Sequence, residues 1–177
     1  MNTKLMRELL AMPFEPGDIE WRVQQAGYTK DGKKIWAQVL AYVTNRAIQE
    51  RLDDVCGIDG WKNVYEKAPD GGVMCGISVK FTDEWITKWD GAENTHVEAV
   101  KGGLSGSMKR AAVQWGVGRY LYYLEANFAT CRSDKPSDMT GWVRATAKLS
   151  KDDKYATPFY YKVPILPDWA LPRKEES

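Results

Sequence analysis

The chain has 177 residues, of which 25 are Lys or Arg and 24 are Asp or Glu, so its formal net charge is +1. One domain is the default at this length, and an apolar fraction of 44% is enough to form a hydrophobic core. The near-zero net charge argues against a generally basic protein that coats DNA, so any nucleic-acid-binding surface should be a local groove.

The first residues predict an amphipathic helix. Residues 1–12 place Leu5, Leu9 and Met12 on one side of such a helix, and Pro13 ends it. A helix of this length is unstable alone in water, so we expect it to pack against the rest of the protein.

Alternating apolar and polar side chains predict five strands, at residues 18–25, 34–43, 61–67, 73–81 and 84–89. Residues 46–55 are expected to form a helix that Thr44 or Asn45 caps and Gly57 ends. Residues 90–94 are expected to form the loop before the central helix. The predicted fold class is therefore α+β, an antiparallel β-meander packed by one long helix, which gives a β-β-β-α core.

The central stretch, residues 98–124, is basic on one side. It carries four permanent positive charges and no acid from Ala99 onward: Lys101, Lys109, Arg110 and Arg119. An apolar stripe with helical spacing runs along it: Leu104, Met108, Ala111 and Trp115. Lys109 and Arg110 should point away from this stripe, beside Gly102, Ser105, Gly106 and Val113.

The three glycines at 102, 103 and 106 lower helix propensity and allow two explanations. One is close approach by a ligand or a neighbouring chain. The other is a frayed helix N-terminus capped by Ser105 or Ser107. The sequence GGLSGSMKR lacks the Gly-Lys-Ser/Thr ending of a phosphate-binding loop, so ATP is not expected, and the sequence predicts no cofactor.

Cysteine spacing does not predict a metal site. Cys56, Cys75 and Cys131 lack Cys-x-x-Cys spacing and, with the lone His96, match no recognised zinc pattern. They are interpreted as buried thiols in a reducing compartment. A signal peptide and an apolar run of about 18 residues are both missing from the sequence, which predicts a cytoplasmic protein.

The last third of the chain has a weaker pattern. Residues 141–148 and 159–163 are candidate short strands, the remainder of 126–157 stays unassigned, and residues 173–177 are expected to be a disordered tail. We therefore expect a single domain over residues 1–172.

Three separated sequence blocks carry a family resemblance: KGGLSGSMKRAAVQWGVGRYLY from Lys101, RLDDVCGIDGW from Arg51, and FYYKVPILPDWALP from Phe159. Together they resemble the phage-type branch of the Rad52/Rad22 family of single-strand annealing proteins, which implies that the single domain over residues 1–172 is an annealing and oligomerisation domain. The resemblance spans residues 14–172. It implies ATP-independent annealing of complementary strands in homologous recombination and double-strand break repair, by a non-enzymatic, ring-forming protein of a bacterial host cell. It names as partners single-stranded DNA, further copies of the chain, and a single-strand DNA-binding protein or an exonuclease.

The same resemblance suggests which residues bind DNA. Lys109 and Arg110 match an adjacent Lys-Arg pair that relatives use on the floor of a DNA groove, where they would bind phosphate. Arg46 lies near a groove arginine of relatives, and Lys101 lies two helical turns before Lys109. Further candidates are Arg119, which has an equally good structural role in pinning the helix end to an acid, and two cations of the opposite groove wall, Lys80 and Lys88.

Two aromatic residues and one acidic cluster leave alternatives open. Trp85 and Trp89 should share one strand face, where packing in a core or an interface competes with base stacking. Asp152-Asp153-Lys154 is the one local pattern that would suit a metal-dependent nuclease of the same pathway. A protein-only assembly module, with the basic helix at a subunit contact, is the other alternative to an annealing protein.

Overall fold

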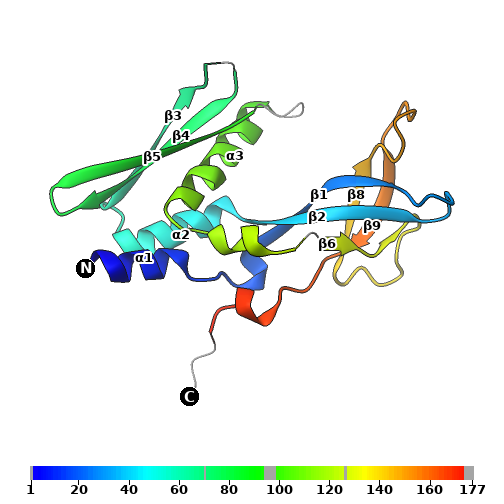
Figure 1. Ribbon diagram of the computed structural model, residues 1–177, viewed down its shortest axis with the longest axis horizontal. Helices are drawn as coiled ribbons and strands as arrows, with labels where there is room; N and C mark the ends of the chain where they lie inside the picture. The colour runs from blue at the N-terminus through cyan, green and yellow to red at the C-terminus, as the bar shows by residue number, and fades with distance from the viewer. Residues whose placement is uncertain (1, 70, 94–98, 126, 174–177) are drawn as a thin grey trace. The chain divides into compact units, whose positions relative to one another are not determined.

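The computed structural model describes residues 2–69, 71–93, 99–125 and 127–173 (Figure 1). The chain forms two compact units. Unit 1 comprises Met1–Ile19, Val43–Tyr123 and Asp168–Ser177, and unit 2 comprises Glu20–Tyr42 and Leu124–Pro167. None of the helices in the described ranges is long and apolar enough to cross a membrane.

Helix α1 (Thr3–Ala11) opens unit 1, and the Asn2 side chain caps it by accepting a hydrogen bond from the Lys4 N–H at 2.7 Å. The helix buries Met6 and Leu10, whereas Leu5 is 47% exposed. The predicted apolar side was therefore wrong. Two apolar stripes lie next to each other on this short helix, and packing against helix α2 decides which one is buried.

Helix α2 (Asn45–Cys56) extends one residue beyond each end of the predicted range and lies between the predicted residues Thr44 and Gly57. The Thr44 hydroxyl accepts a hydrogen bond from the Ala47 N–H at 3.2 Å, and Gly57 ends the helix with φ +80°. A left-handed φ of this kind favours glycine, which explains the stop.

Arg51 of α2 fastens α1 to α2. Its guanidinium donates to the carbonyl oxygens of Leu9, Met12 and Pro13 at 2.7–3.2 Å, and lies 4.0 Å from the centre of the Phe14 ring. Leu9 lies in the last turn of α1, and Met12 and Pro13 directly follow the helix, so Arg51 caps the end of α1 from a neighbouring element. Burial lowers the pKa of Arg51 from its usual value.

Three strands form an antiparallel sheet in the order β3-β4-β5: Trp61–Lys67, Val73–Phe81 and Glu84–Ala92. The expected strands at 61–67 and 73–81 are confirmed. The third strand is longer than predicted, because Cys75, Met74 and Val73 pair with residues 90, 91 and 92. The loop expected at 90–94 was thus wrong for residues 90–92, and residue 94 lies outside the described ranges.

Helix α3 (Ala99–Gln114) crosses one face of this sheet and contacts β4 and β5 (Figure 1). Met108, Ala111 and Trp115 are buried, as their stripe predicts. The indole N–H of Trp115 donates to the Ile77 carbonyl at 3.0 Å, and the ring stacks on Phe81 at 5.9 Å. Ser107 does not cap the helix: its hydroxyl is buried in the middle of α3 and donates to the Leu104 carbonyl.

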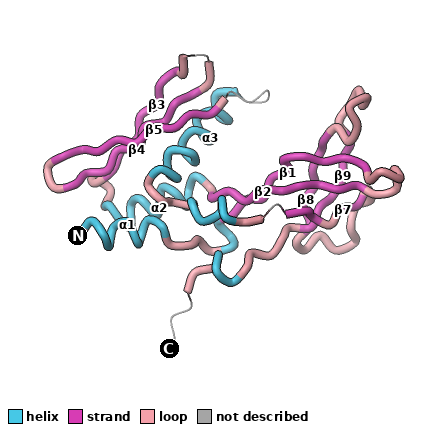
Figure 2. Tube along the Cα trace, in the orientation of Figure 1, coloured by secondary structure: helices cyan, strands magenta, loops and turns pink. Residues whose placement is uncertain are grey.

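Unit 2 contains two small sheets (Figure 2). The first has the order β1-β2-β6, with strands Ile19–Tyr28, Ile35–Val43 and Asn127–Ala129. The second has the order β7-β9-β8, with strands Cys131–Arg132, Thr157–Lys162 and Trp142–Ala147. The sequence predicted four of these strands and missed β6 and β7, which are two or three residues long. The described residues also form three short 3-10 helices: Pro16–Asp18, Arg119–Tyr123 and Asp168–Ala170.

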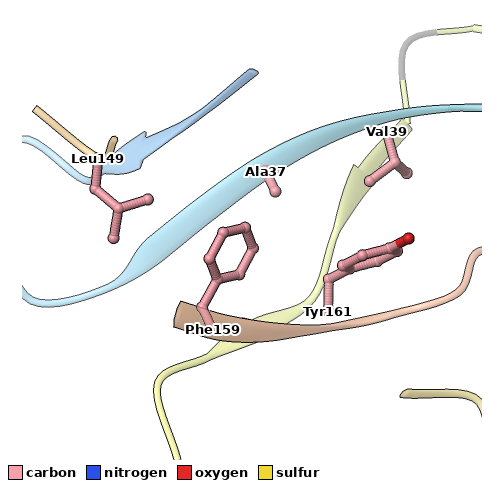
Figure 3. Close-up of a cluster of buried hydrophobic side chains, with 5 residues drawn as sticks. All are labelled: Ala37, Val39, Leu149, Phe159 and Tyr161. Atoms are coloured by element: carbon pink, nitrogen blue, oxygen red, sulfur yellow. The ribbon is translucent and has the colours of Figure 1, made fainter. Parts of the chain in front are cut away.

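The core of unit 2 lies between its two sheets (Figure 3). Ala37 and Val39 of β2 face Phe159 and Tyr161 of β9, and all four are at most 2% exposed. The buried Tyr161 side chain places its hydroxyl in a hydrogen bond, which it donates to the Trp21 carbonyl at 2.7 Å.

The mixed α+β class with antiparallel sheets is confirmed. Of the predicted buried thiols, Cys75 is buried, whereas Cys56 and Cys131 are half-buried.

Candidate nucleic-acid interface

Helix α3 runs antiparallel to strand β5 and contacts it at regular intervals. The contacts join Gly106 with Ala92, Arg110 with Asp90, and Gln114 with Lys88. Four residues of helix rise about 6 Å, and two residues of strand rise about 6.7 Å, so the two steps nearly match. Because the two steps nearly match, every fourth residue of α3 meets every second residue of β5. We call these three residue pairs the α3–β5 ladder.

Gly106 is needed for the close approach at the first pair. A Cβ atom built at Gly106 would lie 3.0 Å from the Ala92 Cβ, which is tighter than ordinary van der Waals contact. The expectation that Gly106 lies on an outer face was therefore wrong. Of the two explanations for the glycines, the structure supports close approach at Gly106, and the approaching element is β5 of the same chain.

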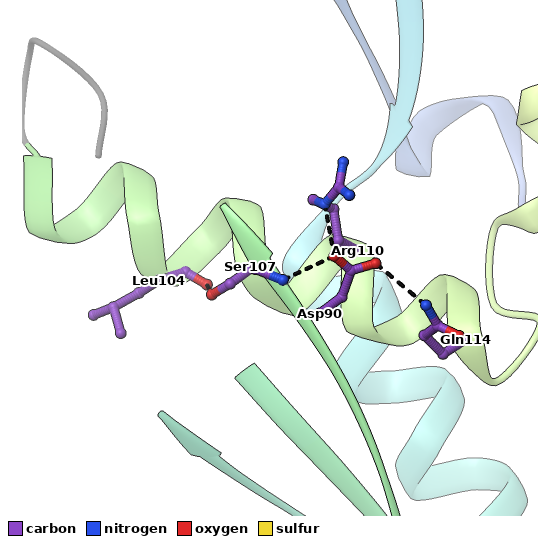
Figure 4. Close-up of polar contacts among 6 residues, drawn as sticks. Asp90, Leu104, Ser107, Arg110 and Gln114 are labelled. Carbon is purple, nitrogen blue, oxygen red and sulfur yellow. Dashed lines mark hydrogen bonds and ion pairs between the residues drawn. The ribbon is translucent and has the colours of Figure 1, made fainter. Parts of the chain in front are cut away.

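The second pair is an ion pair (Figure 4). The Nε–H of Arg110 donates to Asp90 Oδ1 at 2.9 Å, and the Gln114 amide donates to Asp90 Oδ2 at 3.3 Å. The backbone N–H of Gly91 also donates to this carboxylate, at 2.8 Å. Burial alone would raise the pKa of Asp90, but these hydrogen bonds outweigh it and lower the pKa. The Arg110 side chain stays 56% exposed, and the far end of its guanidinium points away from Asp90.

The third pair lies at the C-terminal end of α3. Lys88 Nζ donates to the Gln114 carbonyl at 3.0 Å and lies 4.4 Å from the centre of the Trp115 ring. The Arg119 guanidinium donates to the same carbonyl at 2.9 Å and twice to the Val113 carbonyl, at 2.9 and 2.7 Å. Both cations are favourable here because the helix dipole is negative at this end. The pKa of Lys88 is lowered by burial and by the nearby charge of Arg119.

Arg119 therefore stabilises the C-terminal end of α3. It does so by hydrogen bonds to backbone carbonyl oxygens, whereas the sequence suggested an ion pair with an acidic side chain. Together with Lys88 and Arg110 it forms a cluster, which we call the α3 basic cluster. Arg110 and Arg119 are exposed and Lys88 is half-buried. Cations fixed in this way can bind phosphate oxygens without reading bases.

The structure does not bring Lys80 into this cluster. Lys80 pairs across the strands with Trp85, whereas Lys88 pairs with Ile77. Since side chains alternate along a strand, Lys80 lies on the face of the sheet opposite to Lys88 and α3. The two lysines cannot line one wall of a groove.

Trp85 and Trp89 share the face that carries Lys80, as the sequence predicts, and they are 40% and 38% exposed. Lys62 Nζ lies 4.4 Å from the centre of the Trp85 ring. The Trp89 ring covers Gly76, where a Cβ atom would come within 2.7 Å of it. Neither indole is part of the core of unit 1.

The other predicted cations lie on two helices. Arg46 is exposed in the first turn of α2, and its neighbour Asn45 contacts Met108 of α3, with Nδ2 to Sδ at 3.7 Å. Lys109 is half-buried on α3. The backbone of Lys101 belongs to α3, but its side chain lies outside the described part of the structure.

Sequence reasoning missed Asp90 and Gln114, the two acceptors that organise the cluster. Asp90-Gly91 resembles a turn, which suggested a loop. A signal was nevertheless present, because the alternation of Lys88, Asp90 and Ala92 continues the pattern of the strand.

The acidic pairs of the sequence have structural partners. Asp53 Oδ1 accepts the Trp61 indole N–H at 2.6 Å, and the Asp153 carboxylate accepts the backbone N–H groups of Leu149 and Ser150, both at 2.9 Å. Within the described ranges, no three His, Cys, Asp or Glu side chains are grouped to hold a metal ion. His96 falls outside those ranges.

Comparison with known proteins identifies the family of the chain. The sequence pattern described as "Rad52/22 family double-strand break repair protein" matches residues 2–74 and 70–139. The chain is 30% identical to the single-stranded DNA-binding protein DdrA of Deinococcus radiodurans, over all of this chain and 73% of the relative. It is 29% identical to the protein of the same name from Deinococcus deserti, over all of this chain and 75% of the relative. The chain belongs to the Rad52/22 family of double-strand break repair proteins.

Proposed function

We propose that the protein binds single-stranded DNA and anneals complementary strands in homologous recombination and double-strand break repair, without ATP or a metal ion. The observation that carries this proposal is the α3 basic cluster, in which Lys88, Arg110 and Arg119 come together from β5, α3 and the following 3-10 helix. The family and the names of both DdrA relatives support the same function.

The chemistry of the α3 basic cluster suits annealing. Contacts to phosphate supply affinity without sequence preference, and they leave the base edges free to pair. Asp90 holds Arg110 by Nε, so the outer N–H groups of the guanidinium are oriented before DNA arrives. Holding and aligning two strands needs no acid–base pair, so we propose a non-enzymatic role.

We further propose that strands β3-β4-β5 and helix α3 are the building block of a ring, and that both compact units act together as one annealing domain over residues 1–172. Among the described residues, β3 and β5 each pair with β4 alone, which leaves unpaired backbone groups along both edges of the sheet. A ring repeats one small basic cluster per subunit, so several weak contacts combine into strong binding.

Lys109 and Arg110 remain the first candidates for phosphate binding, and Arg46, Lys101 and Arg119 remain further candidates. Lys88 joins Arg110 in the same cluster. Lys80 would contact DNA only through the opposite face of the sheet. A cellular single-strand DNA-binding protein or an exonuclease is the proposed protein partner, and the cytoplasm of a bacterial or phage-infected cell the proposed location.

The test is annealing of two complementary, fluorophore-labelled strands without ATP or metal. Wild type should accelerate annealing, and Lys109→Gln/Arg110→Gln should lose most of the acceleration and show a flatter salt dependence of binding. Lys4→Gln/Arg7→Gln, which removes two exposed charges from α1, is the matched control and should behave as wild type. An unchanged rate in the folded α3 variant would refute the site, and a wild type that neither binds nor anneals DNA would refute the function.

A further inference from the structure

A second basic surface lies in unit 2, on the outer face of the sheet β7-β9-β8. The inner face of β9 carries Phe159 and Tyr161, which are buried in the core of unit 2. Side chains alternate along the strand, so Tyr160 and Lys162 point to the opposite, outer face. Tyr160 is half-buried there and Lys162 is exposed.

The strand register brings cations and aromatic rings together on this outer face. Tyr160 pairs with Arg132 of β7 on one side and with Arg144 of β8 on the other. In the next row, Lys162 pairs with Trp142. Adjacent strands are about 4.8 Å apart, so the two arginines lie about 10 Å apart with a tyrosine between them. We call these five residues the outer sheet face.

The three cations of the outer sheet face differ in how strongly nearby acidic side chains neutralise their charge. Arg132 forms an ion pair with Asp134, and its guanidinium lies 5.9 Å from the centre of the Trp142 ring. Lys162 interacts weakly with Asp138, whose pKa is lowered mainly by hydrogen bonds from Thr140 and least by Lys162. Arg144 is exposed, and no acidic side chain of the described residues forms an ion pair with it. Arg144 and Lys162 are therefore the cations most available to an external anion.

The mixture of groups indicates which anion fits. An acidic protein would be matched by cations alone, whereas single-stranded nucleic acid offers phosphates and flat bases in alternation. A surface with interleaved cations and aromatic rings matches that alternation, because bases stack on rings and phosphates bind the cations. Two half-buried rings, Trp142 and Tyr160, lie between three cations on this face.

We propose that the outer sheet face is a second contact surface for single-stranded DNA, in which Arg144 and Lys162 bind phosphates and Trp142 and Tyr160 stack on bases. This inference rests on the proposed function and adds a site to it. The two surfaces differ in chemistry. The α3 basic cluster binds phosphates and leaves bases free to pair, whereas the outer sheet face occupies the bases and so retains DNA in unpaired form.

The first experiment measures binding of the full chain to a fluorescent oligothymidylate of about 30 nucleotides as salt is varied. Arg144→Gln/Lys162→Gln should bind more weakly, with a slope of log K against log salt lower by about 1.4, since each phosphate contact contributes about 0.7 on single strands. Lys33→Gln/Lys151→Gln removes two exposed cations of unit 2 that lie on turns, and is the matched control. The salt-dependence slope of the control variant should fall by less than half of the decrease seen for Arg144→Gln/Lys162→Gln.

The second experiment tests stacking. Trp142→Ala should weaken binding of the oligothymidylate about fivefold or more, which is the effect of losing one base–aromatic stack. Binding of an abasic oligonucleotide of equal length should stay within twofold of wild type, because this probe has phosphates and no bases. Equal losses on both probes would overturn the stacking role.

The outcomes separate this inference from the proposed function. If wild type anneals DNA but the Arg144/Lys162 variant binds with wild-type slope, the second surface is refuted and the function stands. If the variant instead changes the mass of the assembly while each assembled subunit binds DNA normally, the face is a contact between protein copies and the inference fails. If wild type binds no single-stranded DNA, both proposals fail.

Discussion

Asp90 on strand β5 accepts the Nε–H of Arg110 on helix α3 at 2.9 Å, which places a carboxylate beside the most basic part of the chain. From Ala99 to Leu124 the sequence has no acid, and the fold supplies one from the preceding strand. This carboxylate orients Arg110 and also cancels part of its charge. The two effects have opposite consequences for DNA binding, and one substitution separates them.

Asp90→Asn should tighten binding of single-stranded DNA about two- to fivefold at low salt. The amide oxygen can still accept the Arg110 Nε–H, while the negative charge that competes with phosphate is gone, so the salt dependence should become steeper. Affinity measured by fluorescence anisotropy at several salt concentrations checks this. Weaker binding by the folded variant would mean that orientation of Arg110 matters more than its net charge.

The same variant should show a change in acid stability. The pKa of Asp90 is lowered in the folded protein from 3.8, the value of an unperturbed carboxyl. A lowered pKa means that the ionised carboxylate stabilises the fold above pH 3.8, and that this contribution is lost as the pH falls below that value. The difference in thermal midpoint between wild type and Asp90→Asn should therefore be constant near pH 6 and shrink below pH 4. A difference that is the same at pH 6 and pH 3 would contradict the assignment.

Arg119→Lys should lower the free energy of unfolding by about 1 kcal/mol, since a lysine cannot reproduce the three hydrogen bonds to the Val113 and Gln114 carbonyls. The charge is preserved, so the salt dependence of DNA binding should not change. Urea unfolding and anisotropy on the same sample measure both quantities. Arg7→Lys, at an exposed position of α1, is the control. Unchanged stability of Arg119→Lys would show that these three hydrogen bonds do not stabilise the end of α3.

Gly76→Ala should destabilise the protein by about 1–3 kcal/mol, because the new methyl group would lie within 2.7 Å of the Trp89 ring. The ring must move outward, so Trp89 should become more accessible to a fluorescence quencher. In a Trp89→Ala background the same substitution should cost much less, and a double-mutant cycle measures the coupling. Additive effects would show that the two residues do not clash.

Much of the fold could be predicted because its signals are local. Thr44 and Gly57 bracket α2 as the capping pattern indicates, and the β3-β4 strands have the predicted ends. The side of α1 that is buried could not be predicted, since Leu5/Leu9 and Met6/Leu10 form equally apolar stripes and only packing on α2 distinguishes them. Strands β6 and β7 were missed because two or three residues do not make a detectable alternation.

The candidate site was predictable in its cations and not in their partners. Arg110 and Arg119 are visible in the sequence as part of an acid-free run, but the acceptors that hold them are a carboxylate from another element and two backbone carbonyls. Every residue has a backbone carbonyl, so the sequence does not indicate which carbonyls accept hydrogen bonds from a side chain. The positions of Lys80 and Lys88 could not be predicted either. They were expected on one wall of a DNA groove, but the strand register of the β4–β5 hairpin places them on opposite faces of the sheet.

The α3–β5 ladder has a consequence for changes in chain length. Because Gly106, Arg110 and Gln114 meet Ala92, Asp90 and Lys88 in step, inserting or deleting one residue between 106 and 114, or between 88 and 92, would shift the contacts beyond that point together. A one-residue change in the helix rotates every later helical residue by about 100°, and a one-residue change in the strand turns every later strand residue to the other face. In homologues, differences in chain length should therefore fall outside these two intervals.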